Sequence, residues 1–359
     1  MTEKKSIDIS LEIFKKLDKI KRDSGFAEKK WDEWLDDIFD EQYDEKKTME
    51  KIFEKSAYEK YYDDWIHNFA LNLENIWNGK SAKELTPNVE EKQIPGIVIG
   101  RGPSIVKYSH LEQLANSNFD GAIICVDSAL RNVLRSGITP DKFKNFFVIT
   151  IDTQISVKEM YSDPIIKQFG NKIKCLLSTT VPLSTYDIVK DSGMKIYWLH
   201  TLFDYNKGQS SFNYISGKMS RSKHHINGIP GIQTGGNVGT SAWVTSWSIL
   251  KCNPVGLIGI DLGYDIKTSW KEIFDYHNLP YDLKEDSEIF EKAFPTIFNP
   301  DFNCHCRLDP KFQFYSNALK EFIPKAAKYV KTINATEGGS IFGKGIECMK
   351  FSEFLKKFS

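Results

Sequence analysis

Six short apolar runs after residue 95 most constrain how this chain can fold. They are rich in Val, Ile, Leu and Phe and are separated by amphipathic stretches; they cover residues 96–100, 121–127, 145–152, 173–179, 195–201 and 255–262. Continuous apolar strands that alternate with helices are typical of a parallel sheet covered on both faces. The sequence therefore predicts an α/β fold with a Rossmann-like, doubly wound and mostly parallel sheet.

The first 90 residues have a different character, because they are rich in charged and aromatic residues and contain no proline before Pro87. Apolar residues recur there at helical spacing, for example Trp65, Phe69, Leu73 and Ile76, which predicts helices with a packing face. We expect an N-terminal helical domain over residues 1–90 and a Rossmann-type domain over 91–359. Within the second domain, the irregular aromatic segment 264–310 is a predicted lid or insertion.

The composition narrows the function classes. The chain has 48 basic and 48 acidic residues, so no net charge favours nucleic acid or an anionic membrane. No apolar run is long enough to span a bilayer, and the start of the chain lacks a signal-peptide pattern. The six cysteines are mostly dispersed and several sit in apolar runs, as reduced thiols do. We expect a cytoplasmic protein.

A glycine-rich turn follows the first apolar run, and it consists of Gly100, Arg101, Gly102, Pro103 and Ser104. Glycines allow backbone amides to approach an anion, and the turn lies between a predicted strand and a predicted helix. The turn lacks the Gly-Lys-Ser/Thr ending of a P-loop and the third glycine of the dinucleotide fingerprint. A tight turn without a ligand explains this motif equally well when it is taken alone.

Polar residues also follow the next two strands. Asp127 and Ser128 end one strand and open a helix, where helix capping is the competing explanation. Asp152, Thr153 and Gln154 end the following strand and could read a ribose hydroxyl, a base edge or a metal ion.

A second glycine-rich helix opening is the most specific stretch, and its candidate binding residues are Gly236, Asn237, Gly239, Thr240 and Ser241. The strand after this helix ends in Asp261. Ligands of doubly wound sheets bind outside the carboxyl ends of the strands, where all these loops should meet. The sequence therefore predicts a nucleotide or sugar-nucleotide site.

Two further features give weaker evidence for a functional site. Cys304, His305 and Cys306 form a Cys-His-Cys run, but a zinc site needs wider spacing and a further ligand pair, so no metal site is predicted. His277 lies in the predicted lid and is a candidate general base, with a surface histidine as the alternative.

Taken together, the motifs resemble those of the 6-hydroxymethylpterin diphosphokinase MptE-like family. The resemblance covers roughly residues 95–350 and rests on GRGPS, CVDSALRNVLRSGITPD, VITIDTQ, GGNVGTSA, CNPVGLIGIDLGY and NATEGGSIFGKGI. The family includes archaeal enzymes that transfer a pyrophosphoryl group from ATP to a pterin alcohol. It also includes motility-associated factors, which are thought to glycosylate flagellin. The same loops look like those of bacterial sialyltransferases.

The departures from these patterns favour one branch. The pterin kinases carry a doubled aspartate where this chain has Asp152 followed by Gln154. The resemblance therefore implies a glycosyltransferase with a nucleotide-activated sugar donor, a CMP-sugar of nonulosonic type, and with His277 and Asp152 as catalytic residues. Arg101 stands where the sialyltransferases have Asn, which leaves the donor open.

Two alternatives remain at this point. One is ATP-dependent pyrophosphoryl transfer to a pterin, with Mg²⁺ held by Asp127, Asp152 and Asp261. The other is a non-catalytic nucleotide-binding module whose N-terminal helices dock a partner. The sugar or protein acceptor is not predicted.

Overall fold

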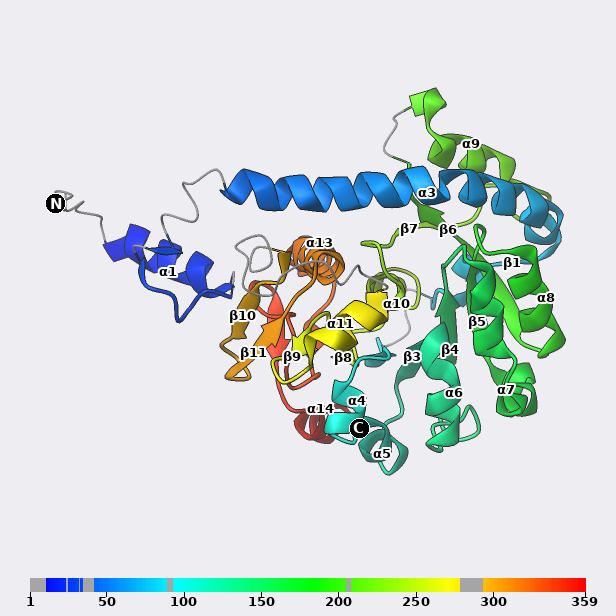
Figure 1. Ribbon diagram of the computed structural model, residues 1–359. Helices are drawn as coiled ribbons and strands as arrows, with labels where there is room; N and C mark the ends of the chain where they lie inside the picture. Colours follow the sequence, from blue (N-terminus) through cyan, green and yellow to red (C-terminus); the bar gives the residue numbers. More distant parts are fainter. Residues whose placement is uncertain are drawn as a thin grey trace, which may run out of the picture.

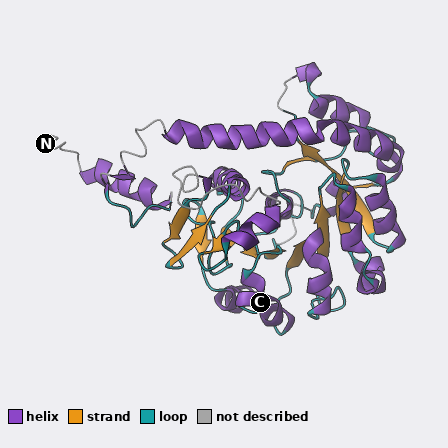
Figure 2. Ribbon diagram, viewed as in Figure 1, coloured by secondary structure: helices purple, strands orange, loops and turns teal. Residues whose placement is uncertain are grey.

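The computed structural model describes residues 11–23, 25–31, 33–34, 42–88, 93–204, 208–277 and 293–359. At the centre of these residues lies one sheet of ten parallel strands (Figures 1 and 2). Its strands are β1 (Lys80–Ser81), β2 (Gly96–Ile99), β3 (Ala122–Val126), β4 (Phe146–Thr150), β5 (Lys174–Ser178), β6 (Lys195–Leu202), β7 (Gly231–Gln233), β8 (Val255–Ile258), β12 (Thr332–Asn334) and β13 (Ile346–Cys348). All the predicted strands are present, so the predicted fold class is confirmed.

The order of the strands reverses at one point. The sheet runs β1-β6-β5-β4-β3-β2-β8-β12-β13, with β7 paired to β6. From β2 the chain builds the sheet outwards through β3 to β6, and it then returns to add β8 on the other side of β2. The pair β2 and β8 is therefore the topological switch point, the place where doubly wound sheets bind their ligands.

Helices lie along both sides of the sheet (Figure 2). The helices of the described residues are α1 (Leu11–Asp23), α3 (Gln42–Asn78), α4 (Ser104–Lys107), α5 (His110–Ala115), α6 (Asp127–Arg135), α7 (Pro164–Phe169), α8 (Leu183–Asp191), α9 (Phe212–Met219), α10 (Val238–Ser248), α11 (Trp270–His277), α13 (Pro310–Ala326) and α14 (Phe351–Phe358), of which α1 lies apart from the central sheet (Figure 1). Short 3₁₀ turns cover Ala82–Leu85, Ile155–Tyr161, Gly170–Lys172 and Gly208–Ser210.

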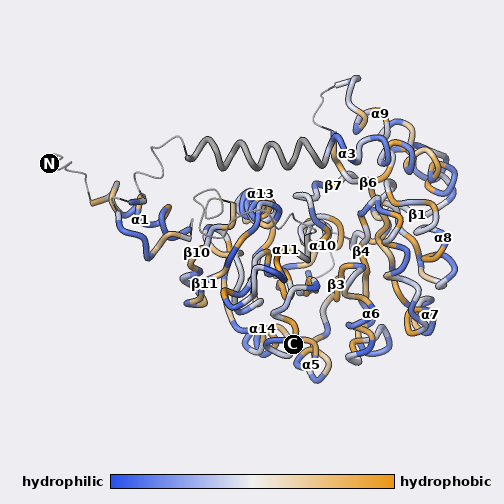
Figure 3. The backbone as a smooth tube through the Cα atoms, viewed as in Figure 1, coloured by the Kyte–Doolittle hydropathy of each residue, from blue (hydrophilic) through white to orange (hydrophobic). Residues whose placement is uncertain are grey.

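The core lies between the sheet and its helices, and the most apolar stretches of the chain are the strands (Figure 3). Every residue of β2, β3, β4 and β8 is buried, which explains their continuous apolar sequence. All six cysteines are free thiols. None of the helices in the described ranges is long and apolar enough to cross a membrane.

The segment predicted as an irregular lid contains regular structure. Strands β9 (Tyr264–Asp265), β10 (Thr296–Asn299) and β11 (Cys304–Arg307) form a small antiparallel sheet in the order β10-β11-β9. Ile297, Cys306 and Leu308 bury one side of it in a small core with Phe342. The expectation of irregular structure was therefore wrong for these strands, because the strand pairing was not evident from local periodicity. A lid function stays a prediction, and residues 278–292 of the segment lie outside the described residues.

The N-terminal region is closely joined to the sheet. The predicted helix around Trp65 is the end of the long helix α3, which crosses the molecule above α13 towards α9 (Figure 1). Directly after it, β1 pairs with β6. The chain thus enters the sheet ten residues before the predicted domain boundary at 90, and the two-domain division itself stays a prediction. The spacing of Trp31, Trp34, Leu35 and Ile38 also predicts a helix, but Leu35 and Ile38 lie outside the described residues.

Two buried asparagines fasten α3 to the carboxyl edge of the sheet. Asn68 Nδ2 donates to Thr153 Oγ1 at 2.6 Å, after β4, and to the Thr180 carbonyl at 3.1 Å, after β5. Asn72 Nδ2 donates to the Thr179 and Val181 carbonyls at 3.3 and 2.8 Å. Buried polar groups that lose their partners cost free energy, so these bonds fix where α3 crosses the edge.

We expect Asn68→Ala to lower the free energy of unfolding by about 2 kcal/mol, because it leaves the buried Thr180 carbonyl and Thr153 hydroxyl without this donor. Urea denaturation measures this change. The control is Asn78→Ala on the same helix, whose amide is exposed and bonds only to the Glu74 carbonyl; it should stay within about 0.5 kcal/mol of wild type. Equal losses in both variants would show that the bonds to the edge do not hold α3.

Candidate functional site at the switch point

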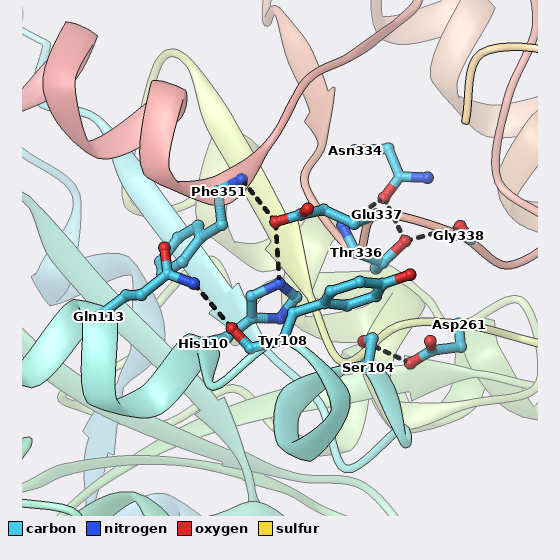
Figure 4. A network of polar contacts seen from close by, with 10 residues as sticks. All are labelled: Ser104, Tyr108, His110, Gln113, Asp261, Asn334, Thr336, Glu337, Gly338 and Phe351. Atoms are coloured by element: carbon cyan, nitrogen blue, oxygen red, sulfur yellow. Dashed lines mark hydrogen bonds and ion pairs between the residues drawn. The ribbon is translucent and has the colours of Figure 1, made fainter. Parts of the chain in front are cut away.

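The loops after β2 and β8 are joined directly to each other. The Gly100 amide donates to the Ile258 carbonyl at 2.9 Å, and the Gly102 amide donates to the Gly259 carbonyl at 2.8 Å. Ser104 Oγ then donates to Asp261 Oδ2 at 2.8 Å (Figure 4). The structure therefore brings the glycine-rich turn and the predicted strand-end aspartate together at the switch point.

The two glycines of the turn are required by this close approach. A Cβ at Gly100 would lie 2.2 Å from the Gly259 carbonyl oxygen, and a Cβ at Gly102 would lie 1.9 Å from Asp261 Oδ2. Both distances are far below van der Waals contact. These positions therefore require glycine because the β8 loop packs against them. The sequence suggested another reason, namely that backbone amides approach an anion.

Asp261 is an almost completely buried carboxyl group. Burial raises its pKa from 3.8 to about 7, although the hydrogen bonds from Ser104 oppose the rise. The loop after β12 covers it, since the Ser340 amide donates to the Asp261 carbonyl at 2.9 Å. Because the Ser104 hydroxyl is directed at Asp261 and only 3% of Ser104 is exposed, this pair holds the two loops together.

Helix α10 begins at the same edge of the sheet and packs against β2, β3, β4 and β8. Asn237 is its N-cap: its side chain accepts from the Thr240 amide at 2.9 Å and donates to Thr240 Oγ1 at 2.9 Å. Ser241 Oγ donates to the Asn237 carbonyl at 3.0 Å, and both hydroxyls are fully buried. The hydroxyl groups of Thr240 and Ser241, two of the predicted binding residues, are therefore bonded to Asn237 within the protein.

The first turn of α10 still offers backbone amides that can bind an anion, as the sequence suggested. Amides at the start of a helix have no acceptor within the helix, and Asn237 takes only one of them. Gly236 is exposed, and Val238 is half-buried. Gly239 packs closely on the β8 loop, because a Cβ there would lie 2.7 Å from Ile260 Cδ1. The Gly236 amide already donates to Thr234 Oγ1 at 3.2 Å, so the amides that α10 offers to an anion are those of its first residues, Val238 and Gly239.

Asp127 is a second buried carboxyl group at this edge, with 4% of the residue exposed. The capping explanation is wrong, because Val126 holds the N-cap position and Asp127 already lies in α6. Its Oδ1 accepts from the adjacent Ser128 amide at 2.6 Å. Burial raises the pKa of Asp127 to about 7, the nearby Asp152 adds to the rise, and Arg101 opposes it. Arg101 from the glycine-rich turn and Asp152 from the β4 loop therefore both lie near Asp127.

The loop after β4 carries one exposed carboxylate and one exposed amide. Asp152 Oδ1 accepts from the Gln154 amide at 3.0 Å. Partial desolvation by the surrounding protein raises the pKa of this carboxyl group. Gln154 Nε2 donates to Tyr61 Oη of α3 at 3.3 Å. Thr153 is buried and serves as the acceptor for Asn68. Asp152 and Gln154 are therefore available to a ligand, and Thr153 is part of the support.

Sequence reasoning missed the close contact between His110 and Glu337. His110 Nε2 lies 3.4 Å from Glu337 Oε1, which also accepts from the Phe351 amide at 3.2 Å (Figure 4). Burial lowers the pKa of His110 although Glu337 opposes this. The imidazole also stacks on Tyr108. The contact between His110 and Glu337 joins the segment after β2 to the loop after β12. Only the NATEGG stretch of the sequence indicated this loop, and no local sequence pattern identifies His110 as a residue of the site.

Two weaker candidates come from the segment 264–310. His277 is the last residue of α11, but its side chain lies outside the described part of the structure, so its role as a general base stays a prediction. In β11, neighbouring side chains point to opposite sides, and His305 bonds to Glu28 at 2.8 Å while Cys306 is buried. No three His, Cys, Asp or Glu side chains within the described ranges are grouped as ligands for a metal ion.

The fold and these loops define a doubly wound α/β protein with a candidate ligand site at its topological switch point. The family model described as "6-hydroxymethylpterin diphosphokinase MptE-like" matches residues 67–267. This match covers more than half of the sequence, so the chain belongs to the MptE-like family, and the resemblance seen in the motifs is confirmed.

A solved structure, that of the MAf glycosyltransferase from Magnetospirillum magneticum AMB-1, has a similar fold. The TM-score is 0.54 at 14% sequence identity, over 80% of this chain and 38% of that protein. This chain therefore spans well under half of the glycosyltransferase that it resembles. A comparison with curated proteins found no match.

Proposed function

We propose that this protein is a glycosyltransferase that uses a nucleotide-activated sugar as its donor, with a CMP-linked nonulosonic acid as the donor class. The observation that carries the proposal is the meeting of three loops at the switch point: those after β2 and β8, and the start of α10. This is where doubly wound sheets bind nucleotides. The fold shared with a glycosyltransferase supports the same reaction class.

Each part of the site has a chemical task in this proposal. The exposed Arg101 and the helix-start amides of Val238 and Gly239 bind the phosphate of the donor, because a guanidinium and helix-start amides both stabilise negative charge. Gly100, Gly102 and Ser104 hold the loop that carries Arg101. Asp127, Asp152 and Gln154 face the ribose and base. The nucleoside monophosphate leaves with its negative charge on these donors, and His277 is the proposed base for the acceptor hydroxyl.

The competing activity is transfer of a pyrophosphoryl group from Mg-ATP to a pterin, which the family description suggests. It would require carboxylates gathered around Mg²⁺. Asp127 and Asp152 lie near each other, but Asp261 Oδ2 is already the acceptor for Ser104, and Gln154 is an amide. The donor set therefore fits a magnesium site poorly and favours the glycosyltransferase.

A thermal-shift and calorimetric comparison of CMP, UMP, AMP and Mg-ATP tests the proposal. We expect a nucleoside monophosphate to bind without Mg²⁺, and a CMP-sugar to be hydrolysed slowly in the absence of an acceptor. Arg101→Ala should raise the Kd of CMP about 10-fold or more, because a charge-assisted hydrogen bond contributes about 1.5–3 kcal/mol. Arg221→Ala, also exposed but outside the site, is the control and should leave the Kd unchanged. Binding of ATP alone, and only with Mg²⁺, would favour the pyrophosphokinase instead.

A further inference from the structure

Helix α3 presents a stripe of four residues to the carboxyl edge of the sheet. Tyr61, Trp65, Asn68 and Asn72 are spaced four, three and four residues apart, so they lie on one face of the helix. The two asparagines bond to the loops after β4 and β5. The two aromatic residues continue the stripe beyond the last of these bonds, and both are half-buried.

The aromatic end of the stripe lies at the β4 loop. Tyr61 Oη accepts from Gln154 Nε2 at 3.3 Å, and the Tyr61 and Trp65 ring centroids are 6.3 Å apart. Phe203 packs against Trp65 with centroids 4.5 Å apart, which holds the indole in place. Asp152, on the same loop as Gln154, is exposed. Aromatic rings and exposed polar groups thus line one corner of the candidate site.

The position of this corner matches one part of a nucleotide. Strand β4 is the second neighbour of β2 in the sheet, and neighbouring strands are about 4.8 Å apart, so the corner is about 10 Å from the switch point along the edge. Asp127 directly follows β3, the strand between them. In a doubly wound sheet, the residue at that place contacts ribose when the phosphate lies at the switch point. The next loop along is then within reach of the base.

We propose that Tyr61 and Trp65 of α3, with Asp152 and Gln154, form a subsite for a nucleobase that carries an exocyclic amine, that is cytosine or adenine. The rings stack on the base, and Asp152 accepts a hydrogen bond from its amine, as carboxylates do with cytosine. Gln154 offers a donor and an acceptor to the remaining ring atoms. The subsite rests on the proposed function only in requiring that the ligand be a nucleotide.

In this proposal α3 contributes to base specificity through residues that the family model does not include. The match begins at residue 67, so Tyr61 and Trp65 lie before the residues that the family model covers. The sequence pattern alone predicted Trp65 as a packing residue, and its contact with Phe203 agrees with that in part. The bond from Gln154 to Tyr61 is what connects the helix to the site.

The test compares the affinities of CMP, AMP, UMP and ribose 5-phosphate by calorimetry. In wild type, we expect CMP or AMP to bind more tightly than UMP and much more tightly than ribose 5-phosphate. Trp65→Ala should weaken binding of the preferred nucleotide by about 5- to 150-fold, because stacking of a base contributes about 1–3 kcal/mol. Its affinity for ribose 5-phosphate should stay the same. Asp152→Asn should reduce the preference for CMP or AMP over UMP.

Two variants separate stacking from damage to the fold. Trp65→Phe keeps an aromatic ring and should restore most of the affinity. Leu71→Ala removes an exposed apolar side chain from the same helix, outside the stripe, and should bind every ligand as wild type does.

Three results would overturn the proposal in distinguishable ways. Equal weakening of CMP and ribose 5-phosphate by Trp65→Ala, or weakening of neither, removes the base subsite and leaves the glycosyltransferase standing. If Trp65→Ala changes only the KM of the acceptor, this corner of the site binds the acceptor and not the base. Binding of no nucleotide by wild type defeats both proposals, whereas base-selective binding without glycosyl transfer defeats only the proposed reaction.

Discussion

Gly102→Ala should be strongly destabilising. The added Cβ would lie 1.9 Å from Asp261 Oδ2 and 2.8 Å from the Gly259 carbonyl oxygen, so the β2 and β8 loops must separate. Separation breaks the buried bond from Ser104 to Asp261. Overpacking and the lost bond together should cost about 3 kcal/mol or more, seen as a Tm lowered by roughly 5–10 °C. Nucleotide affinity should fall as well, because Arg101 is carried on the same turn.

Gly217→Ala is the matched control, since a Cβ at this position in α9 meets no atom within 4 Å. The same change should be neutral or slightly stabilising there, because alanine favours helix. Differential scanning calorimetry of the two variants and wild type measures the difference. A Gly102→Ala protein that melts with wild type and binds nucleotide normally would show that the loops are not as closely packed as described.

Asp127→Asn should change how stability depends on pH. Burial raises the pKa of Asp127 to about 7 in the folded protein, against 3.8 in the unfolded chain, so the folded state binds more protons between these values. The carboxyl group therefore makes stability fall as pH rises from about 4 to about 7. A shift of this size corresponds to roughly 4 kcal/mol. Asparagine has no charge to bury and can still accept from the Ser128 amide.

Urea denaturation at pH 5, 6, 7 and 8 measures this effect. The stability of Asp127→Asn relative to wild type should increase with pH and level off above about pH 7. Asp141→Asn is the control, because Asp141 is exposed and pairs with Lys172 at the surface; its difference from wild type should show no such rise. A relative stability of Asp127→Asn that falls with pH would mean that the native carboxylate is ionised and stabilised, contrary to its burial.

Much of the fold could be predicted because its signals are local. Buried parallel strands must be apolar along their whole length, so β2 to β6 and β8 are visible as runs in the sequence. The short strands β1, β7 and β13 were missed, since two or three residues carry no periodicity. The antiparallel sheet within 264–310 was missed for a related reason, because its strands are stabilised by pairing with one another and by a small core around Phe342.

The candidate site could be predicted in its location but only partly in its chemistry. The sequence by itself determined that glycines and aspartates stand at the carboxyl ends of the strands, because strand ends and turn residues are read from neighbouring positions. The tertiary structure alone decided what they contact. Ser104 and Asp261 are 157 residues apart in the chain, and Gln154 and Tyr61 are 93 apart. Such contacts depend on strand order and on where α3 crosses the edge, and these are set by packing of the whole chain.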